Sequence, residues 1–387
     1  MKLPRGAGIL LHPTSLPSGR IDAEAYRFVD WLADAGMSWW QVLPLGPPDE
    51  ASSPYRAASA FAGWRGLLAR PDARVTAREL EEFVSAHPYW IGHWATYAGG
   101  DAVADQVRFQ REWTALREYA RERGVGLIGD VPIYVAQGSV DHLAHPELFL
   151  DGLVAGAPPD PLGPLGQHWG NPLFDWDAVA KDGYRWWIER LRRTFALFDL
   201  TRLDHFRGFA DFWAIPEDET DARTGHWLPG PREAVFRAAE VQLGPLPVIA
   251  EDLGLITPDV TELRDALGFP GMVVLLWAIH PTERVDSPHR LENHREHQVI
   301  YTTTHDTDTL RGHFPGRDPW ELIELALSSR PELCMIPAQD VLGLGSEGRM
   351  NTPGEPLGNW TWRLEPGQLT DGHAARLRAA TTVTGRL

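Results

Sequence analysis

The sequence predicts an α/β fold, a (β/α)₈ barrel formed by a single domain over residues 1–387, and three observations support this fold class. Eight short β-rich runs recur along the chain, and most are continuous apolar stretches, as expected for strands buried in a parallel sheet. Helical patterns lie between several of these runs, an alternation typical of α/β folds. No Gly-x-Gly-x-x-Gly motif follows an early run, which makes a doubly wound nucleotide-binding sheet the second choice.

The elements follow in order along the chain. Apolar residues at helical spacing predict helices within 25–32, 109–120 and 184–195. Thr257 and Pro258 are typical of the N-cap and first residue of a fourth helix, which continues to Leu267. Residues 284–297 show no clear helical stripe. The eight expected strands are 7–11, 38–44, 126–135, 200–205, 247–252, 272–279, 299–305 and 333–340.

Two segments interrupt this alternation and are predicted to be insertions. Residues 49–105 separate the second and third strands, are rich in Pro, Gly and aromatic residues, and are expected to form an inserted subdomain. Residues 150–182 follow the third strand and are expected to form an inserted active-site loop region. Both segments leave the carboxyl ends of strands, the face of a barrel on which active sites are found.

Charge and composition restrict the classes of partner. The chain carries 36 Lys and Arg residues against 53 Asp and Glu residues, a formal net charge of −17. Such a chain repels nucleic acid and anionic membranes, and a neutral or cationic partner fits better. Without a signal-peptide pattern or an apolar stretch of ~20 residues, we expect a soluble, cytoplasmic protein. The single cysteine, Cys334, excludes an intramolecular disulfide and is expected to be buried and inert.

Charged residues cluster where four of the expected strands end. Asp130 ends the third strand, Asp204 the fourth, Glu251 the fifth and Asp306 the seventh. A charged group directly after an apolar strand is costly unless it projects into a cavity. A satisfied ion pair explains one such strand as well as an active site does. Four of them favour an active site, because the carboxyl ends of parallel strands converge in a barrel.

These residues are suited to glycoside chemistry, in which one carboxylate attacks the anomeric carbon and a second carboxyl group protonates the leaving oxygen. Asp204 and Glu251 lie on neighbouring strands and can reach the separation of about 5–5.5 Å typical of retaining enzymes. We expect Asp204, Asp252 and burial to raise the pKa of Glu251. Arg202 lies two residues before Asp204 on the same strand face and is expected to hold it ionised.

Several motifs resemble those of the 4-α-glucanotransferases, also called amylomaltases or disproportionating enzymes, and the resemblance covers nearly the whole chain. The strongest are Arg-x-Asp-His-Phe-Arg-Gly-Phe at 202–209, Ile-Ala-Glu-Asp-Leu-Gly at 249–254 and Thr-His-Asp at 304–306. Further segments resemble the family in the same order. They are 12–17, 53–55, 59–63, 129–133, 166–172 and 349–354.

The resemblance implies that Asp204 is the nucleophile, Glu251 the general acid/base and Asp306 the stabiliser of the transition state. It implies a 4-α-glucanotransferase that transfers α-1,4-glucan segments between maltooligosaccharides through a covalent glucosyl-enzyme, without a cofactor or metal. For each of the other matched positions, structural support is an alternative to sugar binding. The implied substrate-binding residues are Tyr55, Asp130, Gln167, Trp169, Arg202, His205, His305 and Asn351.

The chain also departs from the family pattern. The segment after Tyr55 and the stretch between His305 and Cys334 are shorter than in typical members, and Trp64-Arg65 replaces the usual Asn-Pro. Several tryptophans beside Gly, Pro or His either fill the core or stack on a sugar ring. They are Trp64, Trp90, Trp94, Trp169, Trp227 and Trp360.

Three other functions stay open at this point. An α-glucan hydrolase would use the same site with water as the acceptor. A metal-dependent barrel hydrolase is suggested by the 15 histidines, although the first strand offers only His12 where such enzymes usually have His-x-His. A non-catalytic glucan-binding protein would not need Asp204, Glu251 and Asp306 together. Product analysis, metal content and turnover, respectively, separate these alternatives.

Overall fold

The computed structural model describes residues 3–159, 164–280, 282–355 and 357–387. In these residues, eight parallel strands form one sheet, and a backbone hydrogen bond of 2.9 Å from Ala250 N–H to Pro270 O joins its two edge strands into a barrel. The expected (β/α)₈ barrel is therefore confirmed. In spatial order the strands are β10 (Gly271–Val274), β11 (Gln298–Tyr301), β12 (Leu333–Pro337), β1 (Gly6–Leu10), β2 (Trp39–Gln41), β3 (Gly126–Pro132), β6 (Leu200–Asp204) and β9 (Val248–Ala250).

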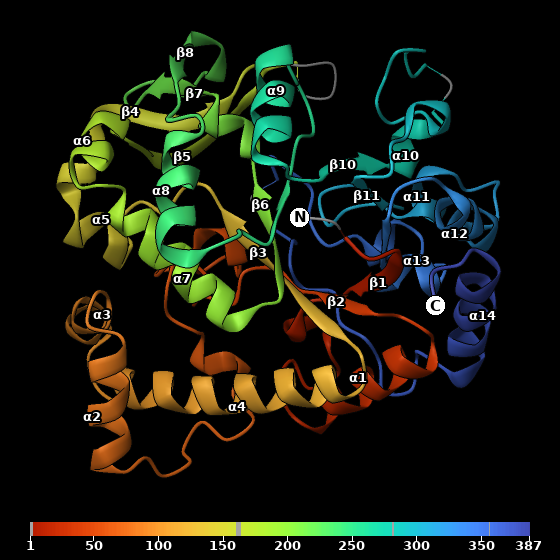
Figure 1. The fold of residues 1–387 in the computed structure, drawn as a ribbon, viewed down its shortest axis with the longest axis horizontal. Coiled ribbons are helices and arrows are strands. Elements are labelled where there is room, and N and C mark those ends of the chain that lie inside the picture. The colour runs from red at the N-terminus through yellow and green to blue at the C-terminus, as the bar shows by residue number, and fades with distance from the viewer. Residues whose placement is uncertain (1–2, 160–163, 281, 356) are drawn as a thin grey trace.

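Helices surround this barrel (Figure 1). The long helix α4 runs along the lower edge of the view with α2 and α3 at its left end, while α11 to α14 lie at the right. The helices are α1 (Ala23–Asp34), α2 (Ala77–Ala86), α3 (Ile91–Ala98), α4 (Ala102–Glu122), α5 (Val140–Ala144), α6 (Trp176–Lys181), α7 (Arg185–Leu197), α8 (Ala234–Leu243), α9 (Pro258–Leu267), α10 (Leu275–Ala278), α11 (Leu310–His313), α12 (Pro319–Ser328), α13 (Ala338–Val341) and α14 (Asp371–Val383).

The four helices expected from apolar spacing are present as α1, α4, α7 and α9. In α1, Ala25, Phe28, Val29 and Leu32 are buried, and the Asp22 carboxylate accepts the Glu24 N–H at 2.9 Å as an N-cap. Thr257 occupies the N-cap position of α9, but its hydroxyl donates to the Asp259 carboxylate instead of accepting a backbone N–H. Residues 284–297 contain only a short 3₁₀ turn, Leu291–Asn293, consistent with the missing stripe.

All eight expected strands end one to five residues earlier than predicted, and in two of them the rest of the apolar run is helical. The apolar run 272–279 divides into β10 and the short helix α10, and the run 333–340 divides into β12 and α13. Nearly all residues of both runs are buried, so apolar content alone did not separate the strand from the turn of helix that follows it. Cys334 is fully buried in β12, and burial raises the pKa of its thiol to about 11, as expected for an inert cysteine.

A second sheet lies beside the barrel, at the upper left of Figure 1. It is antiparallel, with the order β5 (Gln167–Phe174), β4 (Phe149–Ala157), β7 (Asp211–Pro216) and β8 (His226–Pro229). The predicted insertion 150–182 supplies β4, β5 and α6, with residues 160–163 outside the described residues. The sequence analysis predicted none of these four strands, and β7 and β8, which follow β6, complete the sheet outside the predicted insertion.

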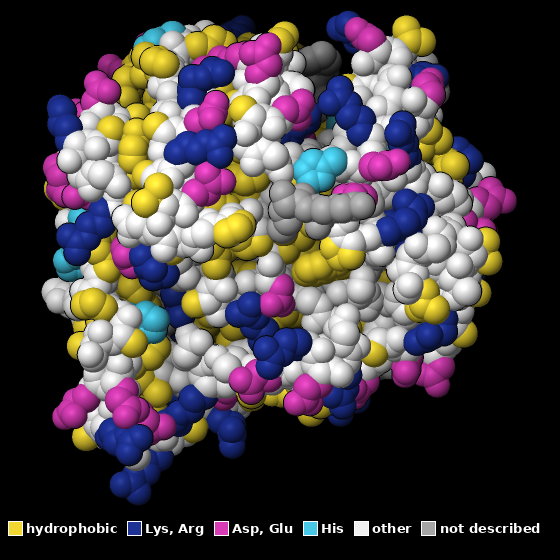
Figure 2. All heavy atoms as spheres, viewed as in Figure 1, with side chains coloured by type: hydrophobic (Ala, Val, Ile, Leu, Met, Phe, Trp, Pro, Cys, Tyr) yellow, Lys and Arg dark blue, Asp and Glu magenta, His cyan; other side chains and the backbone are white. Residues whose placement is uncertain are grey.

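The inside of the barrel is filled by apolar side chains from neighbouring strands. Ile128, Leu200, Ile249, Met272 and Val299 pack together there and are at most 2% exposed. A packed interior of this kind leaves the carboxyl ends of the strands as the surface for a site. Lys/Arg and Asp/Glu side chains are interspersed over the face drawn in Figure 2. No helix in the described residues is both long and apolar enough to cross a membrane.

Candidate active site

The acidic residues singled out from the sequence meet at the carboxyl ends of the barrel strands. Asp130 lies in β3 directly beside Arg202 of β6, and Asp204 is the last residue of β6. Glu251 follows β9, and its backbone N–H donates to Leu203 O in β6 at 3.1 Å. The register between neighbouring strands therefore brings together side chains that lie far apart in the sequence.

Arg202 links three of the carboxylates. It is 4% exposed, and its Nη1 lies 2.7 Å from Asp130 Oδ2. Its Nη2 lies 2.7 Å from Asp204 Oδ1 and 4.0 Å from Glu251 Oε2. The Asp204 and Glu251 oxygens are therefore no further apart than these two distances combined, which is compatible with the separation of about 5–5.5 Å in retaining glycosidases. The prediction that Arg202 and Asp204 share one strand face is confirmed.

Glu251 is held in a buried position by two backbone donors. Its Oε2 accepts the His205 N–H at 2.6 Å, and its Oε1 accepts the Leu253 N–H at 2.9 Å. His205 has a left-handed backbone conformation with φ 50°, and this turn after β6 aims its N–H at Glu251. Burial raises the pKa of Glu251 to about 7; Arg202 opposes the rise and the charge of Asp204 adds to it.

The expected contribution of Asp252 to this pKa is wrong. Asp252 forms an ion pair with Arg264 of α9, and its Oδ1 accepts the Met272 N–H at 2.7 Å. Successive side chains of an extended backbone point to opposite sides, so Asp252 lies on the other side of the chain from Glu251. Its charge is offset there by Arg264.

Asp306 is fixed from the opposite side of the barrel. Its Oδ1 accepts a hydrogen bond from Asn351 Nδ2 at 2.7 Å, and His305 Nε2 lies 3.2 Å from its Oδ2. Burial alone would raise the pKa of Asp306, but His305 and Asn351 lower it far below its ordinary value. Arg349 Nη2 donates to Asp306 O at 2.8 Å, so the backbone is fixed as well as the side chain.

Tyr55 connects the two sides of this cluster. Its hydroxyl donates to Asp130 Oδ2 at 2.9 Å and lies 2.9 Å from His305 Nε2. The Tyr55 and His305 rings stack with centroids 5.2 Å apart and an interplanar angle of 16°. Burial raises the pKa of Asp130 to about 6, against the opposing effects of Arg202 and the Tyr55 hydrogen bond. The insertion that carries Tyr55 is thus joined to β3 and to the loop after β11.

Gln167 and Trp169 lie at the edge of the same site on β5. Trp169 Nε1 donates to Gln167 Oε1 at 3.0 Å, and the Trp169 ring meets the His205 ring edge-on with centroids 4.8 Å apart. Arg56 donates to Trp169 O at 2.7 Å and so ties the two predicted insertions together. The structure places both residues beside the end of β6, with the Gln167 amide oxygen already occupied by Trp169.

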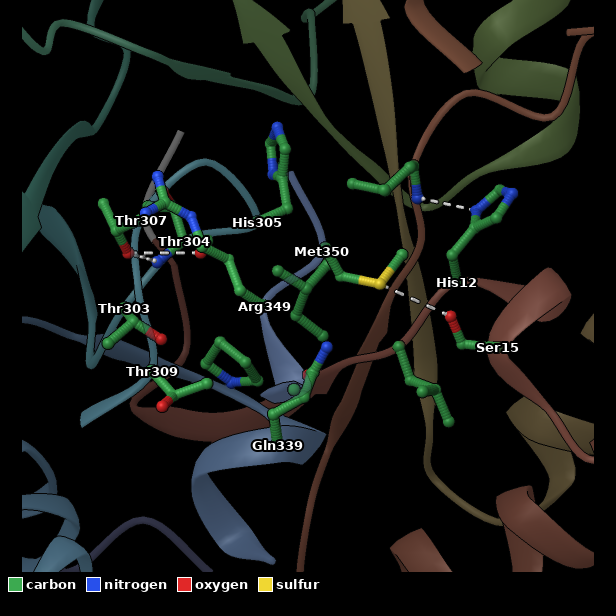
Figure 3. Close-up of a pocket in the computed structure, with 15 residues that line it drawn as sticks. His12, Ser15, Thr303, Thr304, His305, Thr307, Thr309, Gln339, Arg349 and Met350 are labelled. Atoms are coloured by element: carbon green, nitrogen blue, oxygen red, sulfur yellow. Dashed lines mark hydrogen bonds between the residues drawn. The ribbon is translucent and has the colours of Figure 1, made fainter. Parts of the chain in front are cut away.

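A small pocket beside the proposed site is lined by His305 and by residues of the loop after β1 (Figure 3). Its space of about 20 Å³ suffices for a single water, for which roughly 10–15 Å³ is needed. His12 lies in its wall and accepts the Leu43 N–H at 3.2 Å, and the Ser15 hydroxyl lies 3.7 Å from Met350 Sδ. Burial lowers the pKa of His12 to about 3, so this histidine is neutral at ordinary pH.

Trp360, one of the tryptophans for which the sequence left core packing and sugar stacking open, lies beside the site, although it was not among the predicted site residues. Its ring centroid lies 5.7 Å from that of Tyr55 and 6.0 Å from that of His305. It has a left-handed backbone conformation with φ 63°, which is uncommon for a residue with a side chain. The neighbouring Gly358 and Asn359 were the available signals for a turn, but they gave no indication that the indole would meet Tyr55.

In the described residues, no group of three or more His, Cys, Asp and Glu side chains has the arrangement of metal ligands. The carboxylates that converge here are engaged by Arg202, Asn351, Tyr55 and backbone N–H groups. Such a site is organised for acid, base and nucleophile roles. Fold and site together define the class of (β/α)₈ enzymes with a carboxylate-lined site at the carboxyl ends of the strands, an arrangement typical of carbohydrate-active enzymes.

Comparison with known proteins narrows this class of enzymes to one family. A family model described as 4-alpha-glucanotransferase, glycoside hydrolase family 77, matches residues 11–84 and 102–370. The chain is 37% identical to a 4-alpha-glucanotransferase of Thermus thermophilus over 502 aligned residues that cover 100% of both proteins. It is 36% identical to a chloroplastic or amyloplastic 4-alpha-glucanotransferase of Arabidopsis thaliana, covering 99% of this chain and 86% of the relative.

Solved structures agree. The amylomaltase of Streptococcus agalactiae in complex with acarbose superimposes with a TM-score of 0.92 at 28% identity, covering 99% of each chain. An amylomaltase of Corynebacterium glutamicum shares the fold with a TM-score of 0.84 at 16% identity. The chain belongs to the 4-α-glucanotransferase family, and its activity is transfer of α-glucan segments.

The chain is shorter than its relatives within the shared fold. The alignment with the Thermus protein spans 502 positions, whereas this chain has 387 residues, so that relative carries segments absent here. The family model does not match residues 85–101, which include α3. This gap lies inside the segment 49–105 that the sequence analysis predicted to be inserted.

Proposed function

We propose that this 4-α-glucanotransferase works by retaining double displacement, with Asp204 as the nucleophile and Glu251 as the general acid/base. The observation that carries this assignment is that Arg202 Nη2 contacts both carboxylates, at 2.7 and 4.0 Å. The raised pKa of Glu251, about 7, suits a group that gives and then takes a proton near neutral pH.

In the first step, an Asp204 oxygen attacks the anomeric carbon of a glucosyl unit in an α-1,4-glucan. The bond from this carbon to the leaving oxygen breaks, and the Glu251 carboxyl group donates its proton to that oxygen. In the second step, the Glu251 carboxylate removes a proton from an acceptor hydroxyl. The acceptor oxygen then attacks the anomeric carbon and releases Asp204.

Asp306 stabilises the positive charge that develops on the sugar ring in the transition state of each step. The low pKa of Asp306 supports this role, because the carboxylate stays ionised throughout the working pH range. Tyr55, Asp130, Arg202, His205, His305 and Asn351 line the subsite at which the bond is broken, and Gln167 and Trp169 cover the bound glucan. Asn351 has a second task in holding Asp306 at 2.7 Å.

Maltooligosaccharides and longer α-1,4-glucans are the proposed donors and acceptors, and the cytoplasm is the proposed location. Transfer exceeds hydrolysis only if the acceptor is well oriented, because water is present at ~55 M and proximity must outweigh it. We propose that residues 49–105 and 150–182 provide that orientation as subdomains over the site. The contact between Arg56 and Trp169 O supports a joint action of the two segments.

Two experiments test the proposal. Asp204→Asn retains the shape of the side chain but cannot form the glucosyl-enzyme, so turnover falls by a factor on the order of 10⁴ or more. Near-normal turnover in a folded Asp204→Asn protein removes Asp204 as the nucleophile. Incubation with maltotriose, followed by chromatography, is expected to give glucose together with products longer than the starting sugar. Glucose and maltose alone, at every substrate concentration, contradict the proposed preference for sugar acceptors.

A further inference from the structure

A second cavity lies between the barrel and helix α7, and it borders the proposed site at Tyr55 and Asp130. It has a space of about 70 Å³ and is lined by one face of α7 and by the segment around Phe61. The α7 residues are spaced at i, i+3, i+4 and i+7, the spacing of a helix face that points in one direction. They are Arg190, Arg193, Thr194 and Leu197.

Arg193 is the unusual group in this wall. It is 5% exposed; its Nη1 donates to Gln110 Oε1 at 2.6 Å and its Nε to Phe61 O at 3.2 Å. Its Nη2 is buried without a hydrogen-bond partner. Among the described residues Arg193 forms no ion pair with a carboxylate, and burial alone lowers its pKa, to about 10. The guanidinium is therefore still charged at neutral pH.

Two other buried arginines show how this chain normally accommodates such a charge. Arg386 is 1% exposed and also lacks a carboxylate, but its Nε, Nη1 and Nη2 donate to five backbone carbonyl oxygens at 2.6–3.0 Å. Arg190 interacts electrostatically with Asp141 and donates to Ile133 O at 3.3 Å. The guanidinium carbon of Arg193 lies 5.5 Å from the centroid of the Trp90 ring, but Arg193 has neither a carboxylate nor a complete set of acceptors, and a buried charge without such partners is costly.

The surrounding wall offers further donors. The Tyr134 hydroxyl, in the cavity wall, is buried without a partner. Ser59 Oγ accepts the N–H groups of Phe61 and Ala62 at 3.1 Å each, which leaves the hydroxyl proton available to donate. One carboxylate, Asp130, also borders the cavity and is bound to Arg202 at 2.7 Å, which it shares with Asp204. The wall is therefore rich in donors, and its Arg193 has no carboxylate partner among the described residues.

We propose that this cavity binds one monovalent anion of chloride size against Arg193. Water would satisfy the free Nη2 but would not balance the charge, whereas a small anion does both. The space of about 70 Å³ exceeds what one water needs, roughly 10–15 Å³, and leaves room for an ion. The bound anion stabilises the packing of α7 against the segment around Phe61. This inference does not depend on the glucan chemistry.

The first test uses thermal unfolding of the full chain in sodium chloride and in sodium gluconate at matched ionic strength. An anion that binds only the folded state lowers the unfolding constant about tenfold when it is present at ten times its Kd. The unfolding midpoint is expected to rise with chloride and then saturate, but not with gluconate. Arg193→Met is expected to lose the response. Arg192→Met, in which an exposed arginine of the same helix is replaced, is expected to keep it.

The second test requires no variant, so it decides the question even if Arg193→Met fails to fold. Crystals of the unmodified protein grown in sodium bromide are expected to show one anomalous peak within hydrogen-bond distance of Arg193 Nη2. Water density without a bromide peak would falsify the anion site. Equal midpoints in chloride and gluconate, or a chloride response retained in a folded Arg193→Met variant, would equally overturn it.

Discussion

Replacing Tyr55 with Phe gives a narrow test of the proposed site. The hydroxyl of Tyr55 donates to Asp130 Oδ2 and contacts His305 Nε2, both at 2.9 Å, while its ring stacks on His305. Phe retains the ring and the stacking and removes one oxygen atom. Any change in activity therefore comes from the hydroxyl and from the groups that it holds.

The size of the effect follows from the partners that remain. A hydrogen bond to a charged group contributes about 1.5–3 kcal/mol. Asp130 keeps Arg202 at 2.7 Å, so its carboxylate is not left alone, and the lower part of this range applies. At 1.4 kcal/mol for each factor of ten, a loss of about 1.5–2 kcal/mol lowers kcat/KM roughly 10- to 30-fold.

The pH dependence should change in a defined direction. The Tyr55 hydrogen bond lowers the pKa of Asp130, which burial nevertheless raises to about 6. Below this pH Asp130 loses its charge, and with it the ion pair to Arg202. In Tyr55→Phe the pKa of Asp130 rises, so the acidic limb of kcat/KM moves to higher pH.

The assay is the initial rate of glucose release from maltotriose, measured across pH together with the thermal unfolding midpoint. Tyr119→Phe is the matched control, because Tyr119 donates to both Asp30 oxygens at 2.9 Å on the outer helices. It is expected to affect stability and to leave kcat/KM unchanged. An unchanged kcat/KM and an unmoved acidic limb in folded Tyr55→Phe would refute the role assigned to Tyr55.

Three further predictions concern the same site. The alkaline limb of kcat/KM is expected near pH 7, where Glu251 loses the proton that it donates as the general acid. Glu251→Gln should abolish the activity, and an alkaline limb above pH 9 in the unmodified enzyme contradicts the assignment. Asn351→Ala removes one donor to Asp306 and should lower kcat by about 10- to 100-fold through a charged hydrogen bond, with circular dichroism as the folding control. EDTA should leave the initial rate unchanged; loss of activity that a stoichiometric divalent ion restores refutes this.

Part of this protein could be predicted from local sequence. All eight barrel strands were located because buried parallel strands are continuous apolar runs. The placement of Asp130, Asp204 and Glu251 followed, because parallel strands bring their carboxyl ends to one face. The pairing of Arg202 with Asp204 needed only the two-residue period of a strand. The resemblance of the motifs to one family then assigned roles to these positions.

Other features of the fold could not be predicted from local sequence patterns. The divisions between β10 and α10 and between β12 and α13 occur within uniformly buried stretches. The second sheet was not predicted, because it depends on the pairing of β4 with β7, two strands that lie far apart in the sequence, while β8 only extends the sheet beyond β7. The burial of Arg193 likewise depends on Phe61 and Gln110, which come from two other segments.

The sequence by itself determined the repeating strands and helices, the carboxylates at the strand ends and the family. Only the tertiary structure decided which partner each group has. Tyr55 contacts His305, 250 residues away in the chain, while Asp252 forms an ion pair with Arg264 and does not contact Glu251. Strand periodicity is a local property of the backbone, and it fixes the direction of a side chain relative to its own strand. The groups that shift a pKa or leave a donor unpaired are brought close by the closure of the barrel and the docking of its insertions, and local periodicity carries no information about them.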